Sequence, residues 1–203
     1  MDRYWLLTWT TYGTWLPGDD RGFVSNVRDG EGPEVRHNSP GTEPDAKQRG
    51  LWLSAKSNMK GPAVYLSAEQ AAAVLEQLQE TSRYRGWELL AVAIMANHIH
   101  VVVGVPGDPE PDTLLRDFKS YASRKLNKSF DRPLSETWWT ESGSRRKLPN
   151  EAAVIAGVAY VREQEFPLLV WSASGGRESP DSGSCDPLQQ NQGADAPGSP
   201  GDE

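Results

Sequence analysis

Two apolar runs rich in β-branched residues follow one another closely in the middle of the chain, at residues 87–94 and 98–105. Runs of this length and composition predict buried strands, and the short connection between them predicts a tight turn or a bulge. The two strands are therefore expected to pair as a hairpin. The rest of the fold has to be arranged around this hairpin.

The segments on either side of the hairpin predict one more strand and several helices. Residues 3–11 are dense in β-branched and aromatic types and predict a first strand. Ser67 followed by Gln70 is typical of a helix N-terminus, and Gly86 predicts the end of that helix. Further along, we expect a helix over 112–128, a short strand over 137–141 and a last helix over about 150–165. This order predicts an α+β fold, a ferredoxin-like (split β-α-β) antiparallel sheet with helices on one face and an appended C-terminal helix.

The folded domain is expected to span residues 1–171, with a long loop insertion at 17–61 that is rich in Gly, Pro, Asp and Asn. Residues 172–203 are rich in Gly, Ser, Pro and Asp, which predicts a disordered acidic tail. The one cysteine, Cys185, excludes a disulfide framework and a cysteine zinc site. There is no apolar run of about 18 residues that would predict a membrane helix, and the N-terminus lacks the pattern of a secretory signal. A cytoplasmic protein is therefore expected.

The net charge of −7 argues against a nucleic-acid partner until its distribution is considered. Residues 173–203 carry one basic and six acidic side chains, whereas residues 116–147 carry nine basic and four acidic ones. A nearly neutral body with one basic stretch can bind a phosphate backbone, although an ordinary solvated helix face has the same pattern. The expected nucleic-acid contacts are Arg116, Lys119, Arg124, Lys125, Lys128, Arg145, Arg146 and Lys147, with Trp15 as the best stacking platform for an unpaired base.

Two of the three histidines, His98 and His100, open the second strand of the predicted hairpin. Residues two apart in a strand point to the same face, so both imidazoles are expected to project together. Such a pair supplies half of a divalent metal site, and Asn97 could orient one ring. The alternative is a polar patch on a solvated sheet face, and the pair alone does not decide between the two.

The last predicted helix carries Tyr160 and Gln164, four residues apart and so on one helix face. The phenol oxygen could attack a phosphorus atom, and the amide oxygen could complete the metal shell. A neutral oxygen donor with two histidines suits Mg²⁺ or Mn²⁺ better than a structural zinc ion. The alternative is that Tyr160 is a packing residue and Gln164 a solvated one. Tyr121 is the rival nucleophile, but it falls on the apolar stripe of its helix and is expected to be mostly core.

Four segments carry a resemblance to a known family, and they are Leu7–Asp19, Met95–His100, Trp138–Arg145 and Tyr160–Gln164. In this order they resemble the HUH single-strand endonucleases, and in particular their single-tyrosine transposases, including the REP-associated tyrosine transposases. The resemblance implies that His98 and His100 are metal ligands, that Tyr160 is the nucleophile and that Gln164 is the third ligand. It also implies metal-dependent nicking and joining of single-stranded DNA with hairpin or palindromic ends, through a 5′-phosphotyrosine. The family typically has proline where Ala96 stands.

Two other classes of function are compatible with parts of the sequence. A non-catalytic or recruited single-stranded nucleic-acid-binding module of ferredoxin-like fold would present aromatic residues on its central strands, where this chain has histidines. A barrel-type metallohydrolase would need more ligands than His37 can add, and a longer chain. The expected partner is single-stranded DNA with a hairpin. Because related enzymes include dimers and monomers, a homodimer and a monomer both stay open.

Overall fold

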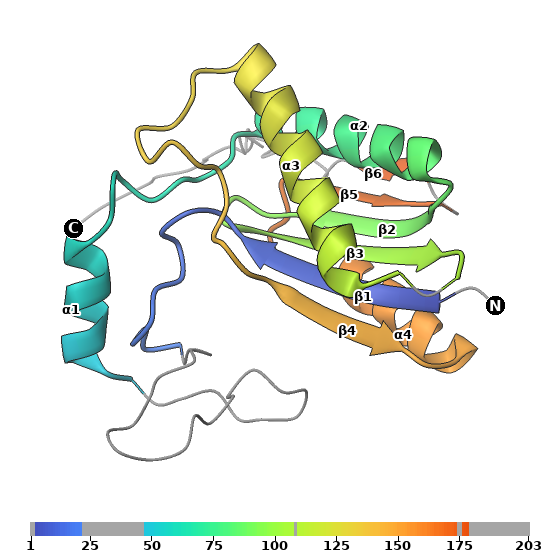
Figure 1. Ribbon diagram of the computed structural model, residues 1–203. Coiled ribbons are helices and arrows are strands. Elements are labelled where there is room, and N and C mark those ends of the chain that lie inside the picture. The colour runs from blue at the N-terminus through green and yellow to red at the C-terminus, as the bar shows by residue number, and fades with distance from the viewer. Residues whose placement is uncertain (1–2, 22–46, 108, 174–175, 179–203) are drawn as a thin grey trace, which may run out of the picture.

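The computed structural model describes residues 3–21, 47–107, 109–173 and 176–178 (Figure 1). Its strands form one antiparallel sheet in the order β4-β1-β3-β2-β5-β6. The first four strands and two of the helices follow the β-α-β-β-α-β order that the sequence predicts, so the ferredoxin-like class is confirmed. The strands are β1 (Arg3–Thr10), β2 (Glu88–Ile94), β3 (His98–Val105), β4 (Ser144–Leu148), β5 (Leu169–Ser172) and β6 (Gly176–Glu178).

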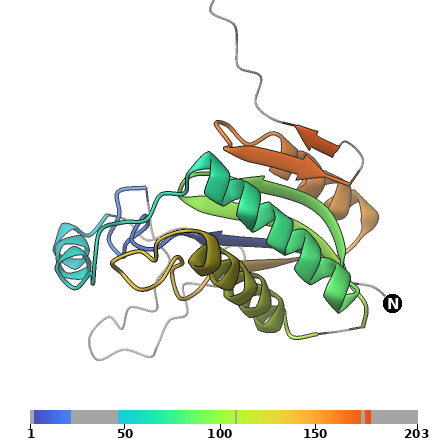
Figure 2. The same ribbon diagram turned by 90° about the horizontal axis from the view of Figure 1, so that it is seen from above.

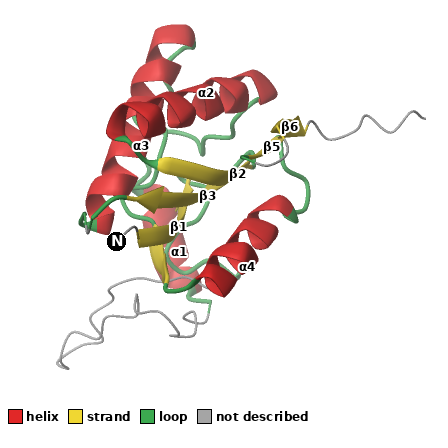
Figure 3. Cartoon of the chain, turned by 90° about the vertical axis from the view of Figure 1, so that its right-hand side faces the viewer, coloured by secondary structure: helices red, strands yellow, loops and turns green. Residues whose placement is uncertain are grey.

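Helices cover both faces of the sheet. Helices α2 (Ala68–Arg85) and α3 (Pro111–Ser129) lie side by side on one face (Figure 2), and α4 (Glu151–Arg162) lies on the other (Figure 3). The strands alternate accordingly, because odd-numbered residues of β3 are buried beneath α2 and α3 while Val102 packs beneath α4. The site described below lies on the α4 face of this sheet.

Helix α2 begins and ends where its sequence predicts. The Ser67 hydroxyl accepts a hydrogen bond from the Gln70 backbone N–H at 3.2 Å, and the Gln70 side chain accepts one from the Ser67 backbone N–H at 2.9 Å. Gly86 follows the helix with φ at 66°, the left-handed conformation that glycine adopts without strain. The helix then buries Val74, Leu75 and Leu78 against the sheet.

Three elements differ from the prediction. Helix α1 (Arg49–Ser57) lies inside the predicted loop 17–61, of which residues 22–46 are outside the described part. The predicted strand at 137–141 is wrong, because Trp138 and Trp139 are both buried under α3 and only an isolated bridge links Trp139 to Thr11. Strand β4 begins instead at Ser144.

The C-terminal part of the domain forms the edge of the sheet opposite β4. Strand β5 pairs with β2 and runs to Ser172, one residue past the predicted domain boundary, and β6 lies within the predicted tail. The disorder expected for 172–203 falls mostly on residues outside the described part. No helix in the described residues is both long and apolar enough to cross a bilayer.

Candidate active site around the histidine pair

His98 and His100 project from β3 toward α4, as the strand alternation predicts. Ile99 and Val101 point the other way and are fully buried in the core beneath α2 and α3. The two imidazole rings lie edge to face with their centroids 4.9 Å apart. His100 is buried, with only 5% of its surface exposed, and His98 is half-buried. The pair therefore lies in a partly enclosed site at the start of β3.

Each imidazole is held through its Nδ1 atom. His98 Nδ1 lies 2.7 Å from the side-chain oxygen of Asn97, which accepts a hydrogen bond from it. His100 Nδ1 lies 2.7 Å from the hydroxyl of Thr8, its partner across the β1–β3 ladder. Because the Asn97 oxygen can only accept, the lone pair of His98 is left on Nε2, and the same holds for His100 in the tautomer whose Nδ1–H donates to Thr8. Asn97 thus orients one ring as the sequence suggested, whereas Thr8 was missed.

Both imidazoles are neutral at pH 7. Burial, and to a smaller extent the charge of Arg21, lowers the pKa of His98. Burial, and then the neighbouring His98, lowers the pKa of His100 to about 4. Only the neutral imidazole has a nitrogen lone pair for a metal ion, so the enclosure of the pair favours the form that binds metal.

Tyr160 lies over the histidine pair. Helix α4 begins at an Asn150 cap, whose side chain accepts from the Ala153 N–H at 2.9 Å, and it packs on the sheet through Gly157 and Val161. The Tyr160 ring lies edge to face with that of His100, with the centroids 5.2 Å apart, and 49% of the residue is exposed. Its phenol is therefore next to the imidazoles and open to a ligand.

Gln164 lies beyond the last helix, so the prediction of a helix to about residue 165 is wrong at this end. Helix α4 ends at Arg162, and further along Phe166 has a left-handed φ of 54° directly before Pro167. The Gln164 side chain folds back and its amide nitrogen donates to the Tyr160 carbonyl at 2.9 Å. This contact holds the side chain near Tyr160 through its amide nitrogen. The amide oxygen is then the atom that could bind a metal ion or accept a hydrogen bond.

The residues that would hold the expected divalent cation are His98, His100 and Gln164, and the two neutral imidazoles fit such an ion. His98 and His100 offer two nitrogen atoms held from behind, and Gln164 offers a neutral oxygen. Among the described residues no three His, Cys, Asp or Glu side chains gather as a metal cluster. Of the residues that the structure describes, a third ligand near this pair would thus have to be an amide, a hydroxyl or a backbone group.

The loop after β1 closes around the turn that precedes His98. The backbone carbonyl of Asn97 accepts from the Thr11 N–H at 2.9 Å and from the hydroxyls of Thr11 and Thr14 at 3.1 and 3.2 Å. Arg21 donates to the Thr14 carbonyl and to the Asp19 carboxylate, each at 2.8 Å. This loop belongs to Leu7–Asp19, the first of the four segments that resemble the transposases. It lies directly beside the turn that precedes His98.

The predicted basic contacts lie largely away from the histidine pair. Those on α3 are on the opposite layer, where Lys125 pairs with Glu76 at 2.8 Å and the Arg124 guanidinium lies over Tyr121. On β4, Arg146 pairs with Leu6 and so shares the α4 face with the histidines. Arg145 and Lys147 point to the α3 face. Arg116 and Lys128 are exposed on α3, and Trp15 is 45% exposed in the loop after β1.

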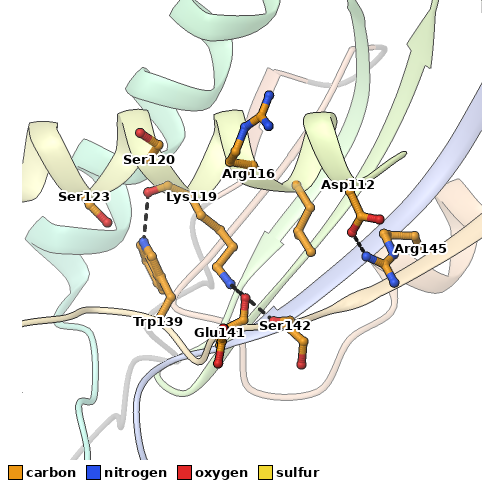
Figure 4. Close-up of a pocket in the computed structure, with 10 residues that line it drawn as sticks. Asp112, Arg116, Lys119, Ser120, Ser123, Trp139, Glu141, Ser142 and Arg145 are labelled. Carbon is orange, nitrogen blue, oxygen red and sulfur yellow. Dashed lines mark hydrogen bonds and ion pairs between the residues drawn. The ribbon is translucent and has the colours of Figure 1, made fainter. Parts of the chain in front are cut away.

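Lys119 and Arg145 line a hollow of about 500 Å³ between α3 and the segment before β4 (Figure 4). The Lys119 ammonium donates to the carbonyls of Thr140, Glu141 and Ser142, and Arg145 pairs with Asp112. Burial lowers the pKa of Lys119 to about 8, so it remains mostly protonated at pH 7. These contacts give Lys119 a structural task that the charge pattern did not reveal.

The geometry also bears on the alternatives. Tyr121 is on α3, across the sheet from the histidine pair, which removes it as the rival nucleophile at this site. His37 lies outside the described residues. The α4 face of the central strands carries Thr8, His98 and His100, so it offers no row of aromatic platforms of the kind a nucleic-acid-binding sheet presents.

Part of this chain is similar to a known protein family. The profile of the family described as "Transposase IS200 like" matches residues 60–164, just over half of the chain, and this range contains His98, His100, Tyr160 and Gln164. No curated protein matches the sequence.

Two solved structures resemble the chain weakly. A REP-associated tyrosine transposase bound to a REP hairpin is 13% identical, with a TM-score of 0.40 over 78% of this chain and 64% of that chain. A protein from Deinococcus radiodurans R1 with a provisional transposase name is 14% identical, with a TM-score of 0.43 over 82% of this chain and 93% of that chain. The chain therefore spans less than two thirds of the first of these proteins.

Proposed function

The chain belongs to the IS200-like transposase family, and on that premise we propose that it nicks and joins single-stranded DNA with Tyr160 as its nucleophile. The observation that carries the proposal is the contact between the rings of Tyr160 and His100, with centroids 5.2 Å apart. A half-exposed phenol beside two neutral, oriented imidazoles is an arrangement suited to attack on a phosphodiester held at the same place.

The histidines and Gln164 would hold the divalent cation. When bound, such a cation offsets the negative charge that builds on the phosphate oxygens during attack. Thr8 and Asn97 keep the two Nε2 atoms available by fixing the opposite ring nitrogens. The Gln164 side chain donates to the Tyr160 backbone carbonyl, so the third donor lies next to the nucleophile in the chain's own fold.

The covalent step exchanges one phosphoester bond for another. The Tyr160 phenol loses its proton to solvent at its exposed edge, and its oxygen bonds to phosphorus. The bond from phosphorus to the 3′ oxygen of the preceding nucleotide breaks, and that oxygen takes up a proton to become a free 3′-hydroxyl. The following strand stays on Tyr160 as a 5′-phosphotyrosine.

Joining is the reverse exchange with a different strand. A 3′-hydroxyl attacks the phosphotyrosine, a new phosphodiester forms, and Tyr160 regains its proton. Because the bond energy is kept in the link to Tyr160, no nucleotide cofactor is required, and the sequence has no Gly-x4-Gly-Lys-Ser/Thr motif. The proposed DNA is a strand with a hairpin or palindromic end, as in the related structure that was solved with a REP hairpin.

The test is adduct formation on a hairpin-bearing single-stranded oligonucleotide with Mn²⁺, read on a denaturing gel. The wild-type chain and a Tyr121→Phe control are expected to give a covalent protein–DNA band, and Tyr160→Phe is expected to give none. An adduct with Tyr160→Phe would show that another residue is the nucleophile. Full activity in excess chelator would overturn the metal assignment, and no adduct from the wild type would favour a non-catalytic DNA-binding module.

A further inference from the structure

Exposed aromatic residues flank an arginine at the edge of the histidine pair. Trp15, in the loop after β1, is 45% exposed, and Tyr65, before α2, is 64% exposed. The Arg21 side chain is 51% exposed, and its guanidinium carbon lies 5.3 Å from the centroid of the Trp15 ring. The function proposed above uses none of the three in its chemical step.

Arg21 is held in a fixed orientation. Its Nε and Nη2 atoms donate to the two oxygens of Asp19, each at 2.8 Å, and Nη2 also donates to the Thr14 carbonyl. Asp19 is 8% exposed, and the hydrogen bonds from Arg21 lower its pKa to about 2, so the pair stays ionised at neutral pH. Within the described part of the chain these contacts use Nε and Nη2, and half of the Arg21 side chain is exposed.

The arginine is connected to the active site by a short chain of contacts. The Thr14 carbonyl accepts a hydrogen bond from Arg21, and the Thr14 hydroxyl donates one to the Asn97 carbonyl at 3.2 Å. The Asn97 side chain in turn holds the His98 ring at 2.7 Å. The charge of Arg21 contributes to the lowered pKa of His98, in keeping with their closeness.

Tyr65 is brought to the same edge by two backbone hydrogen bonds. The Val64 N–H donates to the Tyr12 carbonyl at 2.8 Å, and the Leu66 N–H donates to the Ala96 carbonyl at 2.7 Å. Val64 and Leu66 are buried, so Tyr65 between them points outward. Its phenol is near enough to Arg21 to contribute to the raised pKa of that guanidinium.

Two exposed rings around a fixed cation match the chemistry of an unpaired nucleotide. Aromatic side chains stack on bases that are not paired, and arginine contacts phosphate. We propose that Trp15, Arg21 and Tyr65 form a binding site for unpaired nucleotides, with the rings stacking on bases and the guanidinium contacting the adjoining phosphate. The inference rests on the proposed function for the identity of the strand as DNA, and it places these nucleotides beside His98.

The test is binding of a fluorescein-labelled oligo-dT of about 20 nucleotides, long enough to fill a single-strand site. Fluorescence anisotropy at several salt concentrations, in EDTA, separates binding from cleavage. Trp15→Ala and Tyr65→Ala are each expected to weaken binding about five-fold or more, with an unchanged dependence on salt. The double variant Asp19→Asn with Arg21→Gln removes both charges without leaving a buried carboxylate alone, and it is expected to lower the salt slope by about one.

Tyr84 provides the matched control. It is 79% exposed and lies beside Arg85, whose guanidinium is 5.9 Å from its ring, but it is on α2 on the opposite layer. Tyr84→Ala is expected to leave the affinity within about two-fold of wild type, as a surface change away from the site should. Thermal unfolding of every variant checks that each is folded, and Tyr65 can be truncated without opening a cavity because it is exposed.

Two results would overturn the nucleotide site. One is wild-type affinity in both aromatic variants, and the other is equally tight binding of the wild type to a duplex of the same length. The adduct assay separates this inference from the proposed function. If the variants lose oligonucleotide binding and the wild type forms no adduct, the nucleotide site is supported and the proposed transesterification is overturned. If the wild type forms an adduct and the variants bind the oligonucleotide as tightly as the wild type, the transesterification is supported and the nucleotide site is overturned.

Discussion

The burial of His100 makes the stability of the metal-free protein depend on pH. Its pKa is about 4 in the folded chain, whereas the ordinary value is 6.5. Between these two values the unfolded chain binds a proton that the folded chain does not, so stability must fall as the pH falls. The contribution of His100 is fully present above about pH 7 and is lost progressively down to about pH 4.

The size of the effect follows from the two pKa values. At pH 5 the imidazole is almost fully protonated in the unfolded chain and mostly neutral in the folded one. The difference corresponds to about 2 kcal/mol of stability lost between pH 8 and pH 5. The pKa of His98 is lowered in the same direction and adds to the loss. Asp19, with a pKa of about 2, titrates below this interval. Lys119, with a pKa of about 8, titrates at its upper end, and it does so equally in the wild type and in a His100 variant.

The assay is urea unfolding in EDTA at pH 8 and pH 5, on the wild type and on His100→Gln. The glutamine is neutral at both pH values, so the variant should lose about 2 kcal/mol less than the wild type between them, whatever its stability at pH 8. His98→Gln should also reduce the loss. Equal losses in the wild type and His100→Gln would show that His100 is not kept neutral by burial, and the reasoning about its metal-binding form would fail with it.

Three further predictions concern the support of the site. Thr8→Val removes the hydroxyl that holds His100 at 2.7 Å, and the affinity for Mn²⁺ measured by calorimetry is expected to fall about ten-fold. Lys119→Met removes the ammonium from three carbonyls, and urea unfolding is expected to show a loss of about 1–3 kcal/mol, against less than about 0.5 kcal/mol for exposed Lys128→Met. Gly143→Ala would bring a Cβ within 2.6 Å of the Thr8 carbonyl, so a loss of about 1–3 kcal/mol is expected in the same assay.

The features that could be predicted from the sequence are those encoded by neighbouring residues. The cap at Ser67, the stop at Gly86 and the shared face of His98 and His100 each depend on spacings of a few residues, and the structure has all three. Asn97 belongs with them, because it is adjacent to the ring that it orients. Such signals survive folding because the local backbone geometry that they specify is also the geometry of the native element.

The features that were missed depend on contacts between distant segments. Thr8 meets His100 only because β1 lies beside β3, and Arg21 approaches His98 only through Thr14 and Asn97. Helix α1 has no capping side chain and no buried residue, so it lacks the two signals that predicted α2. Once β1 and β3 are paired, the alternation of side chains between the two faces could have identified Thr8. The register of this pairing cannot be predicted from either strand alone.

The end of α4 shows how the sheet, and not the helix sequence, sets the position of Tyr160. Residues 163–165 are good helix formers, yet the helix stops at Arg162 because the chain must return to the sheet. The Leu168 N–H donates to the Ile94 carbonyl at 2.8 Å, and β5 then pairs with β2. At its other end α4 follows β4, which pairs with β1, after only two residues. Strand pairing on both sides therefore carries Tyr160 over the histidines of its own chain, and the closeness of Tyr160 to His100 is a consequence of the order of the strands.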